Sequence, residues 1–425
     1  MGLLHRNTRL IDRLARREAR VMVLGLGYVG RPLALAFRDA GFEVGGFDPD
    51  DERAGAAADI VRLTRDEATL APADVWLVCV PTPLLDGRPD LSAVRAAARA
   101  AGRVFRPGTL IVLESTSHPG TAREVLLPEY LGAARAAGHA PVLGRDLFVA
   151  SSPERMDPGR AVPPLAAIPK VVGGLDAASG EVAAGFYRGV FDEVVLVESA
   201  EIAEAAKLLE NMYRSVNIAL VDEVKTVLAE LGVDPHAVVR AAATKPFGFE
   251  AFHPGPGPGG HCIPVDPTYF RARAAELGVA TPLLDAAQRV HARTPLWVVE
   301  RVERALGSLA GAEVLVLGLA YKRDIADTRE SSAFPVLREL MARGARVRYA
   351  DPFVPSTLGT EGRDLALDAV ACDAANVAAS DAVLLLVDHT AWDLALVAEH
   401  ARLIVDTRDA FRPWTAALAG RLVRA

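Results

Sequence analysis

A cysteine stands at the end of a segment that is dense in glycine and proline. The segment runs from Lys245 to Pro267 and contains the run GPGPGGHC, which ends at Cys262. Glycines let the backbone approach a bound ligand closely, and a thiolate at the end of such a loop is available as a nucleophile. A buried structural thiol and half of a metal site are the alternatives, but no second pair of metal ligands is spaced nearby. The pattern favours covalent catalysis by Cys262 and no metal.

Polar side chains recur along one stretch of helical sequence. Glu204, Lys207, Asn211 and Arg214 follow one another at intervals of three and four residues, so they share a helix face. A lysine there could stabilise a thiolate or an oxyanion, but the spacing alone slightly favours a plainer interpretation, a solvated polar stripe. Apolar residues at the same period over 200–231 predict one long helix, the spine of a central helical domain.

A glycine fingerprint near the N-terminus indicates a dinucleotide site. Gly25, Gly27 and Gly30 form GxGxxG between an expected strand and an expected helix, and Asp48 follows about 20 residues later. The glycines permit a tight turn, approach to a pyrophosphate and close helix packing, while the helix N-terminus attracts phosphate. A carboxylate at Asp48 binds a ribose diol and repels a 2′-phosphate. We expect NAD rather than NADP, with a plain glycine turn as the alternative.

Further candidates follow expected strands of the same domain. Thr82 and Thr116 come after the strands 74–80 and 109–115, at the strand ends where open α/β sheets bind ligands. Glu154 and Arg155 lie in a turn that brings an acid and a base together. Ordinary turn residues, or a capped turn, explain these positions equally well from the sequence alone.

The elements that position these residues alternate between strand and helix. Continuous apolar strands between alanine-rich helices predict parallel sheets covered on both faces. We therefore expect an α/β protein with two doubly wound, Rossmann-like domains joined by a central helical domain. The expected boundaries are 1–199 for the first sheet domain, which carries the glycine fingerprint, 200–305 for the central helical domain with the cysteine loop, and 306–425 for the second sheet domain.

Composition excludes several classes of protein. A chain of 425 residues is too long for one core, and a net charge of −7 without a basic stripe argues against nucleic acid as a partner. The 3 cysteines are scattered, which fits free thiols in a reducing cytoplasm. The apolar runs are strand-length, so no membrane association is expected. The charged first twenty residues predict a short amphipathic helix before the first strand rather than a signal peptide.

Taken together, these motifs resemble those of the UDP-glucose/GDP-mannose dehydrogenase family, from Val21 to about Arg412. The resemblance is closest to bacterial UDP-N-acetylglucosamine 6-dehydrogenases. It implies an NAD-dependent oxidoreductase of polysaccharide biosynthesis that oxidises the C6 hydroxymethyl of a UDP-sugar to a carboxylate, through a thiohemiacetal and a thioester on Cys262. It also implies that residues 1–199 bind NAD, that the central helical domain 200–305 carries the catalytic loop and forms a homodimer through its long helix, and that residues 306–425 bind the UDP-sugar. The motifs occur in family order as GLGYVGRPLA, VPTPLLDGRPDLS, ESTSHPGT, SPERMDPGR, IPKVVGG, KLLENMYRSVNIALVDE, KPFGFEAFHPGPGPGGHCIPVDP and GLAYKRDIADTRES.

The resemblance also implies residue roles. Lys207 would stabilise the oxyanion, Asn211 and Asp266 would position water or a proton shuttle, and Glu154 would serve as acid and base in the hydrolysis. The catalytic set is Cys262, Lys207, Asn211, Asp266, Glu154 and Thr116. The NAD set is Gly25, Gly27, Tyr28, Val29, Gly30, Asp48, Arg53, Thr82, Thr116 and Arg329. The substrate set is Glu154, Arg155, Lys207, Asn211, Arg214, Lys245, Gly259, Lys322 and Arg408.

Alternatives remain within the family and outside it. Val265 stands where UDP-glucose enzymes usually carry lysine, which argues against UDP-glucose, while Pro258 and Thr268 depart from the usual sugar-pocket residues. UDP-N-acetylmannosamine and UDP-glucose remain alternative substrates. A non-catalytic sugar-nucleotide binder would be expected to have lost Cys262 or Lys207. A simple two-electron dehydrogenase would leave the cysteine loop unexplained.

Overall fold

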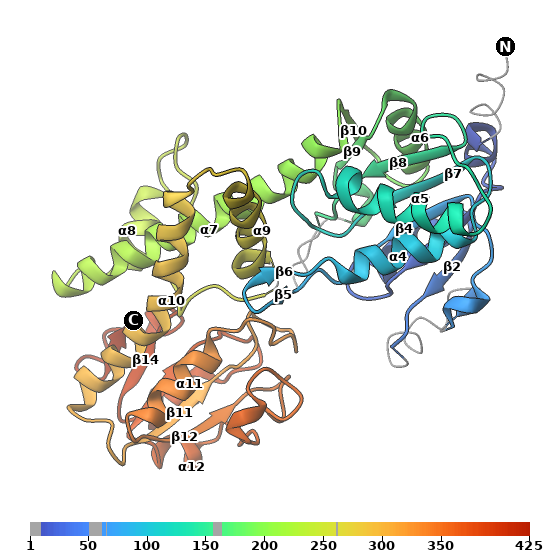
Figure 1. The fold of residues 1–425 in the computed structure, drawn as a ribbon. Coiled ribbons are helices and arrows are strands. Elements are labelled where there is room, and N and C mark those ends of the chain that lie inside the picture. The colour runs from blue at the N-terminus through green and yellow to red at the C-terminus, as the bar shows by residue number, and fades with distance from the viewer. Residues whose placement is uncertain (1–9, 51–61, 65, 156–163, 261) are drawn as a thin grey trace. The chain divides into compact units, whose positions relative to one another are not determined.

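The computed structural model describes residues 10–50, 62–64, 66–155, 164–260 and 262–425. The chain forms two compact units (Figure 1). Unit 1 contains Met1–Glu210 and Thr268–Val279, and unit 2 contains Asn211–Pro267 and Ala280–Ala425. Each unit is built around its own sheet, which agrees with the α/β class and the two Rossmann-like sheets expected from the sequence.

The sheet of unit 1 has the strand order β10-β9-β8-β7-β4-β1-β2-β3 within the described residues. Its neighbouring strands pair in parallel except β8 and β9, which pair antiparallel, a reversal that the sequence analysis did not anticipate. The strands are β1 (Arg20–Leu24), β2 (Glu43–Phe47), β3 (Arg62–Thr64), β4 (Val75–Val78), β7 (Thr109–Leu113), β8 (Leu147–Ser151), β9 (Lys170–Gly174) and β10 (Val194–Val197), with a hairpin of β5 (Leu84–Leu85) and β6 (Arg88–Pro89) outside the sheet.

Helices cover both faces of this sheet. A helical segment over residues 10–15 packs on one face together with α2 (Gly30–Asp39) and α6 (Ala177–Tyr187), in a core that contains stacked Phe37 and Phe186. The opposite face carries α4 (Ser92–Arg103) and α5 (Leu127–Ala136), packed against Trp76. The buried strands between two helical layers explain why their sequences are apolar throughout rather than alternating.

Unit 2 contains a second parallel sheet, with the order β12-β11-β13-β14-β15. The sequence predicted its first four strands but not β15. The strands are β11 (Glu313–Leu317), β12 (Arg346–Ala350), β13 (Ala382–Leu385), β14 (Ile404–Asp406) and β15 (Leu422–Arg424), and the helices beside them are α11 (Ala333–Ala342), α12 (Ala374–Ala378) and α13 (Leu394–His400).

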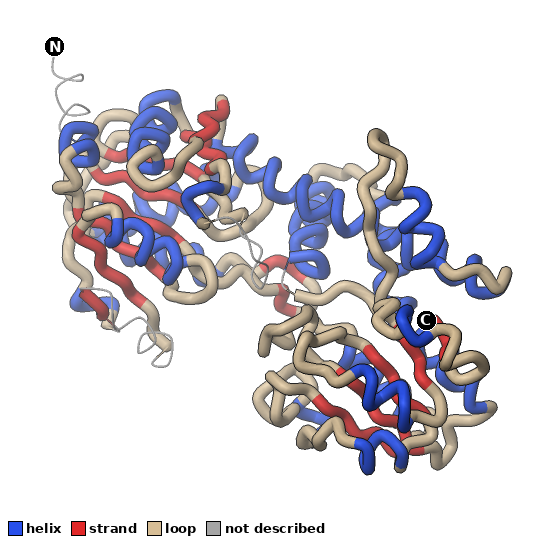
Figure 2. The backbone as a smooth tube through the Cα atoms, turned by 180° about the vertical axis from the view of Figure 1, so that it is seen from behind, coloured by secondary structure: helices blue, strands red, loops and turns tan. Residues whose placement is uncertain are grey.

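Four helices connect the two sheets along the chain; they are coloured blue in Figure 2 with the other helices. They are α7 (Ala200–Glu230), α8 (Pro235–Ala242), α9 (Cys262–Glu276) and α10 (Pro282–Leu306). The long helix predicted over 200–231 is confirmed as α7. No helix in the described ranges is long and apolar enough to cross a membrane.

The predicted loop from Lys245 to Pro267 is correct only in its first part. Residues 245–260 have no regular helix or strand, but α9 begins at Cys262 and runs through Pro267. Pro264 falls in the first turn, where a helix needs no amide from the backbone, so proline is tolerated there. The cysteine therefore stands at the start of a helix rather than within a loop.

Candidate active site

The glycine loop after β1 has the backbone that the fingerprint predicts. Gly25 has φ +91°, and a Cβ there would lie 2.6 Å from the carbonyl oxygen of Cys79. A Cβ on Gly30 would lie 1.8 Å from the carbonyl oxygen of Gly25. At Gly27, in contrast, no atom lies within 4 Å of the Cβ position. The loop is closed around its first and third glycines and open at the second, which leaves space for a phosphate at the helix N-terminus.

Asp48 fixes this loop to the end of β2. Its carboxylate is buried and accepts hydrogen bonds from the backbone N–H of Leu26 at 2.8 Å and of Asp50 at 3.0 Å. Val29 caps α2 without a side-chain hydrogen bond, and Tyr28 beside it is exposed. These residues fit a dinucleotide, with the acid at the strand end as predicted. Arg53, the other predicted adenosine contact, lies outside the described residues.

Thr82 and Thr116 meet at the ends of adjacent strands. The hydroxyl of Thr82 donates to the carbonyl oxygen of Thr116 at 2.9 Å. The loop after Thr116 is held by α7, since the buried carboxylate of Glu204 accepts from the backbone N–H of Gly120 at 2.6 Å and of Ala122 at 2.9 Å. Burial raises the pKa of Glu204 to about 8. Glu204 thus has a structural role in placing the loop that carries Thr116.

Glu154 belongs to a buried ionic cluster that the sequence analysis missed. Its carboxylate is 3.4 Å from the ammonium of Lys170, which also binds Glu114 at 2.6 Å. Arg155 points to other partners, with its guanidinium 2.6 Å from Glu210. The only available signal for the cluster was a lysine at the start of a buried strand, in the motif IPKVVGG.

The polar face of α7 is mostly buried rather than solvated. Glu204, Lys207 and Asn211 have exposed fractions of 1%, 5% and 0%, whereas Arg214 is exposed. The solvated stripe that the spacing alone slightly favoured is therefore wrong for the first three. In the described part of unit 1, no carboxylate pairs with the ammonium of Lys207. A buried cation without a structural ion pair is suited to an anionic group on a ligand.

Unit 2 brings together three of the predicted residues. The side-chain amide of Asn211 donates to Asp266, and its oxygen accepts from the guanidinium of Arg214. Asp266 is buried and stands four residues after Cys262 on α9, so both share one helix face. As the first residue of α9, Cys262 also lies where free backbone N–H groups and the helix dipole favour a thiolate.

The other two cysteines lack these features. Burial raises the pKa of Cys79 well above that of a free thiol, and the charge of Glu114 raises it further. Burial also raises the pKa of Cys372 to about 11. Both thiols are held in the protonated form at neutral pH, so Cys262 is the better candidate for a nucleophile among the three.

Contacts within unit 2 fix the glycine-rich loop before Cys262 at three points. The backbone N–H of Gly255 donates to Asp222 at 3.0 Å, and the ammonium of Lys225 donates to the carbonyl oxygen of the same glycine. A Cβ on Gly259 would lie 2.6 Å from the side chain of Tyr321. Finally, the N–H of Gly260 donates to the carbonyl oxygen of Arg329 at 2.9 Å. The buried pair Asp222 and Lys225 was not predicted, although its spacing of three on α7 was a visible signal.

The remaining predicted residues of unit 2 are Arg408, Lys322, Lys245 and Arg329. Arg408 lies beneath the loop, since a Cβ on Gly255 would be 2.7 Å from its guanidinium, and burial lowers the pKa of Arg408. Lys322 is half-buried in the turn after β11, and Lys245 is exposed with its ammonium over the ring of Phe247. The guanidinium of Arg329 pairs with Asp327 in its own loop at 2.6 Å.

Comparison with known proteins connects this geometry to a family. The chain matches the models of the UDP-glucose/GDP-mannose dehydrogenase family for the NAD binding domain over residues 54–191, the central domain over 201–293 and the UDP binding domain over 315–413. It is 31% identical to the UDP-N-acetyl-D-mannosamine dehydrogenase of Pyrococcus horikoshii, over 92% of this chain and 95% of that protein. The chain belongs to this family.

Two further relatives agree with the assignment. The UDP-N-acetyl-D-glucosamine 6-dehydrogenase of Pseudomonas aeruginosa is 32% identical over 80% of this chain and 84% of that protein. The solved structure of the UDP-D-ManNAc dehydrogenase from Pyrococcus horikoshii superposes with a TM-score of 0.81 at 29% identity, covering 92% of this chain and 95% of that one. The predictions of family, fold, NAD as cofactor and an oxidoreductase acting on a UDP-sugar are confirmed.

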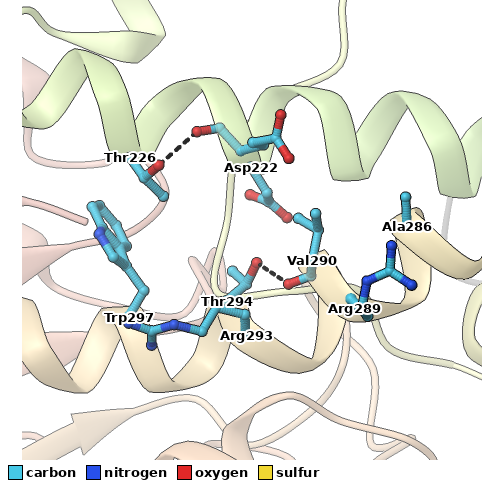
Figure 3. A pocket seen from close by; sticks show the side chains of 9 residues that line it. Asp222, Thr226, Ala286, Arg289, Val290, Arg293, Thr294 and Trp297 are labelled. Carbon is cyan, nitrogen blue, oxygen red and sulfur yellow. Dashed lines mark hydrogen bonds between the residues drawn. The ribbon is translucent and has the colours of Figure 1, made fainter.

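A cavity of about 350 Å³ lies between α7 and α10 of this UDP-sugar dehydrogenase, apart from the predicted site residues (Figure 3). It contacts Asp222 and Thr226 on α7 and Arg289, Arg293 and Trp297 on α10. Asp222 therefore lines the cavity and also accepts a hydrogen bond from Gly255 in the glycine-rich loop before Cys262.

Proposed function

We propose that this enzyme oxidises the C6 hydroxymethyl of UDP-N-acetylglucosamine to a carboxylate, with two equivalents of NAD and covalent adducts on Cys262. The observation that carries the proposal is the placement of Cys262 at the first position of α9, one helical turn before Asp266, which is itself bonded to Asn211. A nucleophile with an adjacent acid and amide is the arrangement that a reaction through a thioester needs.

The reaction has four chemical steps. Removal of a hydride and a proton converts the alcohol to an aldehyde, to which the thiolate of Cys262 adds to give a thiohemiacetal. Loss of a second hydride and a proton gives a thioester. Water then bonds to the thioester carbon and the carbon–sulfur bond breaks, which releases the carboxylate, the thiolate of Cys262 and two protons. Bound NAD supplies the oxidising capacity by accepting the hydride.

The chain's own residues have distinct parts in these steps. The ammonium of Lys207, which is buried, stabilises the oxyanion of the adduct. Asp266, held by Asn211, positions water or shuttles a proton. Glu154 accepts the proton of the attacking water. Thr116 contacts the bound substrate and NAD.

We propose that the chain has three functional parts: residues 1–199 for NAD, 200–305 for the central helical domain and 306–425 for the UDP-sugar. The separate matches of the family's three domains support this division. Two further sets of residues would hold the ligands. NAD would be held by Gly25, Gly27, Tyr28, Val29, Gly30, Asp48, Thr82, Thr116 and Arg329. The UDP-sugar would be held by Arg155, Arg214, Lys245, Gly259, Lys322 and Arg408.

The choice of sugar rests on a small number of observations. The loop motif and SPERMDPG favour N-acetylglucosamine, and a relative with that name is 32% identical. The relative from Pyrococcus horikoshii, named for N-acetylmannosamine, supports that epimer as the second candidate. Val265, in place of lysine, argues against UDP-glucose.

We also propose a homodimer formed through α7. Large apolar side chains are exposed along one face of the helix in unit 2, at intervals of seven, four, three and four residues. An exposed apolar stripe of this length is typical of a protein interface. The stripe consists of Tyr213, Leu220, Val224, Val227 and Leu231. Sedimentation of the wild type should give the mass of two chains, and Val227→Lys should shift it toward one.

The test of the proposed function is an assay of UDP-sugars for NADH formation. UDP-N-acetylglucosamine should give the highest kcat/KM among UDP-N-acetylglucosamine, UDP-N-acetylmannosamine, UDP-N-acetylgalactosamine and UDP-glucose, with two NADH formed per sugar. One NADH per sugar with release of aldehyde would contradict the four-electron reaction. Higher kcat/KM for the mannosamine epimer would overturn the choice of sugar and leave the chemistry intact.

A further inference from the structure

Lys170 brings a positive charge to the edge of the unit 1 sheet where Glu154 lies. It is the first residue of β9, which runs antiparallel to β8 with Ser151 opposite Gly173. The same register, continued by three residues, places Lys170 opposite Glu154. A parallel strand would have carried its first residue to the other end of the sheet. The reversal of β9 therefore delivers an ammonium to the carboxyl ends of β7 and β8.

The contacts of Lys170 show that two carboxylates share one cation. Its ammonium lies 2.6 Å from Glu114, 3.0 Å from the carbonyl oxygen of Ser152 and 3.4 Å from Glu154. These three acceptors use all three donors of an ammonium. The hydroxyl of Tyr187 donates to the second oxygen of Glu114.

The pKa values of the groups in this cluster depend on burial and on the charges of their neighbours. Burial raises the pKa of Glu114, with Lys170 opposing the rise and Glu154 adding to it. Burial works against the charge of Lys170, yet the two carboxylates raise its pKa, so it stays cationic. Burial also raises the pKa values of Cys79 and Tyr187, which are neutral.

The other charged group next to Glu154 does not replace Lys170. The backbone N–H of Arg155 donates to the carboxylate of Glu154 at 2.6 Å, but its guanidinium is turned to Glu210 and to the carbonyl oxygen of Pro169. The ammonium of Lys170, in contrast, lies within 3.4 Å of the Glu154 carboxylate.

We propose that Lys170 is a positioning residue for catalysis, which holds Glu154 as an oriented carboxylate, and that Glu114 competes with Glu154 for its charge. The proposal rests on the proposed role of Glu154 in thioester hydrolysis, where the carboxylate accepts the proton of the attacking water. Lys170 acts on this step through Glu154. Because Glu114 and Glu154 share one cation, Lys170 and Glu114 must have opposite effects on the ionisation of Glu154.

Two variants test this by shifting the acid limb of the kcat–pH profile in opposite directions. Lys170→Met leaves two buried carboxylates without their cation, so Glu154 takes up a proton more readily and the limb moves to higher pH by about one unit or more. Glu114→Gln removes the competing charge, so the limb moves to lower pH. Its amide oxygen can still accept from Lys170, and its amide nitrogen can donate to the hydroxyl oxygen of Tyr187. The double variant should return the limb toward that of the wild type.

Control measurements separate this proposal from a structural role and from the proposed function. Circular dichroism and the affinity for NADH report whether unit 1 is folded. If Lys170→Met fails to fold, Glu114→Gln alone tests the proposal. An acid limb that stays in place or moves to higher pH in Glu114→Gln overturns the proposal. Uniform loss of kcat in both variants, with the limb unchanged, also overturns it and leaves the UDP-sugar activity standing.

The proposed function has its own failing result. If the wild type produces no NADH with any UDP-sugar, the proposed function and the role of Glu154 fall together. If the wild type is active and Glu154→Gln retains both kcat and the acid limb, the role of Glu154 is wrong, and the proposal for Lys170 falls with it while the activity remains.

Discussion

Removing the charge of Asp222 should loosen the loop that presents Cys262. The carboxylate of Asp222 and the ammonium of Lys225 are 3.5 Å apart, with exposed fractions of 0% and 1%. Together they bind both polar groups of Gly255, since Asp222 accepts from its N–H and Lys225 donates to its carbonyl oxygen. Asp222→Asn keeps an acceptor for the N–H but leaves a buried ammonium without its counter-charge.

The expected cost follows from the burial of the pair. Removing one partner of a buried ion pair costs about 3–5 kcal/mol, because the remaining charge is unpaired. Burial lowers the pKa of Lys225, so this lysine can lose its proton and relieve part of the cost. We therefore expect Asp222→Asn to lower the free energy of unfolding by about 3 kcal/mol. Lys225→Met should cost a similar amount. The double variant loses about one hydrogen bond, roughly 1 kcal/mol, and leaves no unpaired charge.

Two measurements report the effect. Urea unfolding can be followed by the fluorescence of Trp297, whose ring lies 4.9 Å from the ammonium of Lys225, and hydrogen exchange follows the peptide that contains Gly255. Glu223→Gln is the matched control, since Glu223 is the exposed neighbour of Asp222 on α7. The reasoning is refuted if each single variant costs less than about 1 kcal/mol, or if the double variant costs the sum of the two.

Three further predictions concern the cofactor, the oxyanion and pH. NAD should greatly exceed NADP in kcat/KM, and Asp48→Asn, which can still accept from Leu26, should narrow the difference; equal values in the wild type would remove Asp48 from this role. Lys207→Ala should lower kcat by about 10²–10³ while the fold is retained, and near-normal turnover would exclude Lys207 as the oxyanion partner. Burial lowers the pKa of His236 to about 4, so the free energy of unfolding should fall as the pH falls from 6.5 toward 4, where the unfolded chain takes up a proton that the folded chain excludes. His236→Met should flatten that part of the stability profile, and an unchanged slope would show that another group is responsible.

Features set by short stretches of sequence could be predicted. Gly30 lies close to the backbone of Gly25, and the space beside Gly27 is open, as the fingerprint requires, because both features depend on neighbours within the same turn. The helix α7 was predicted within one residue, since its apolar period extends over many turns. The role of Cys262 as nucleophile, predicted from its glycine-rich surroundings, stays a prediction. Its position at the start of α9 was missed because the prolines concealed the helix.

Features that depend on distant partners could not be predicted. Lys170 and Glu114 are 56 residues apart, and only the reversal of β9 brings them together. The solvated stripe on α7 was favoured because periodicity shows which residues share a face but not whether that face is buried. Asn211 and Asp266, 55 residues apart, were associated through the family resemblance, and spacing alone would not have paired them.

The most direct test of covalent catalysis at Cys262 is to trap the adduct during turnover. Rapid acid quench of the wild type, followed by digestion and mass spectrometry, should find the mass of the sugar nucleotide on the peptide that contains Cys262. Cys262→Ser should lose steady-state turnover, because an alcohol is scarcely ionised at neutral pH and any ester formed would hydrolyse slowly. Two NADH per sugar at a near-normal rate from Cys262→Ser, with no adduct in the wild type, would contradict the account and require oxidation of a hydrated aldehyde instead.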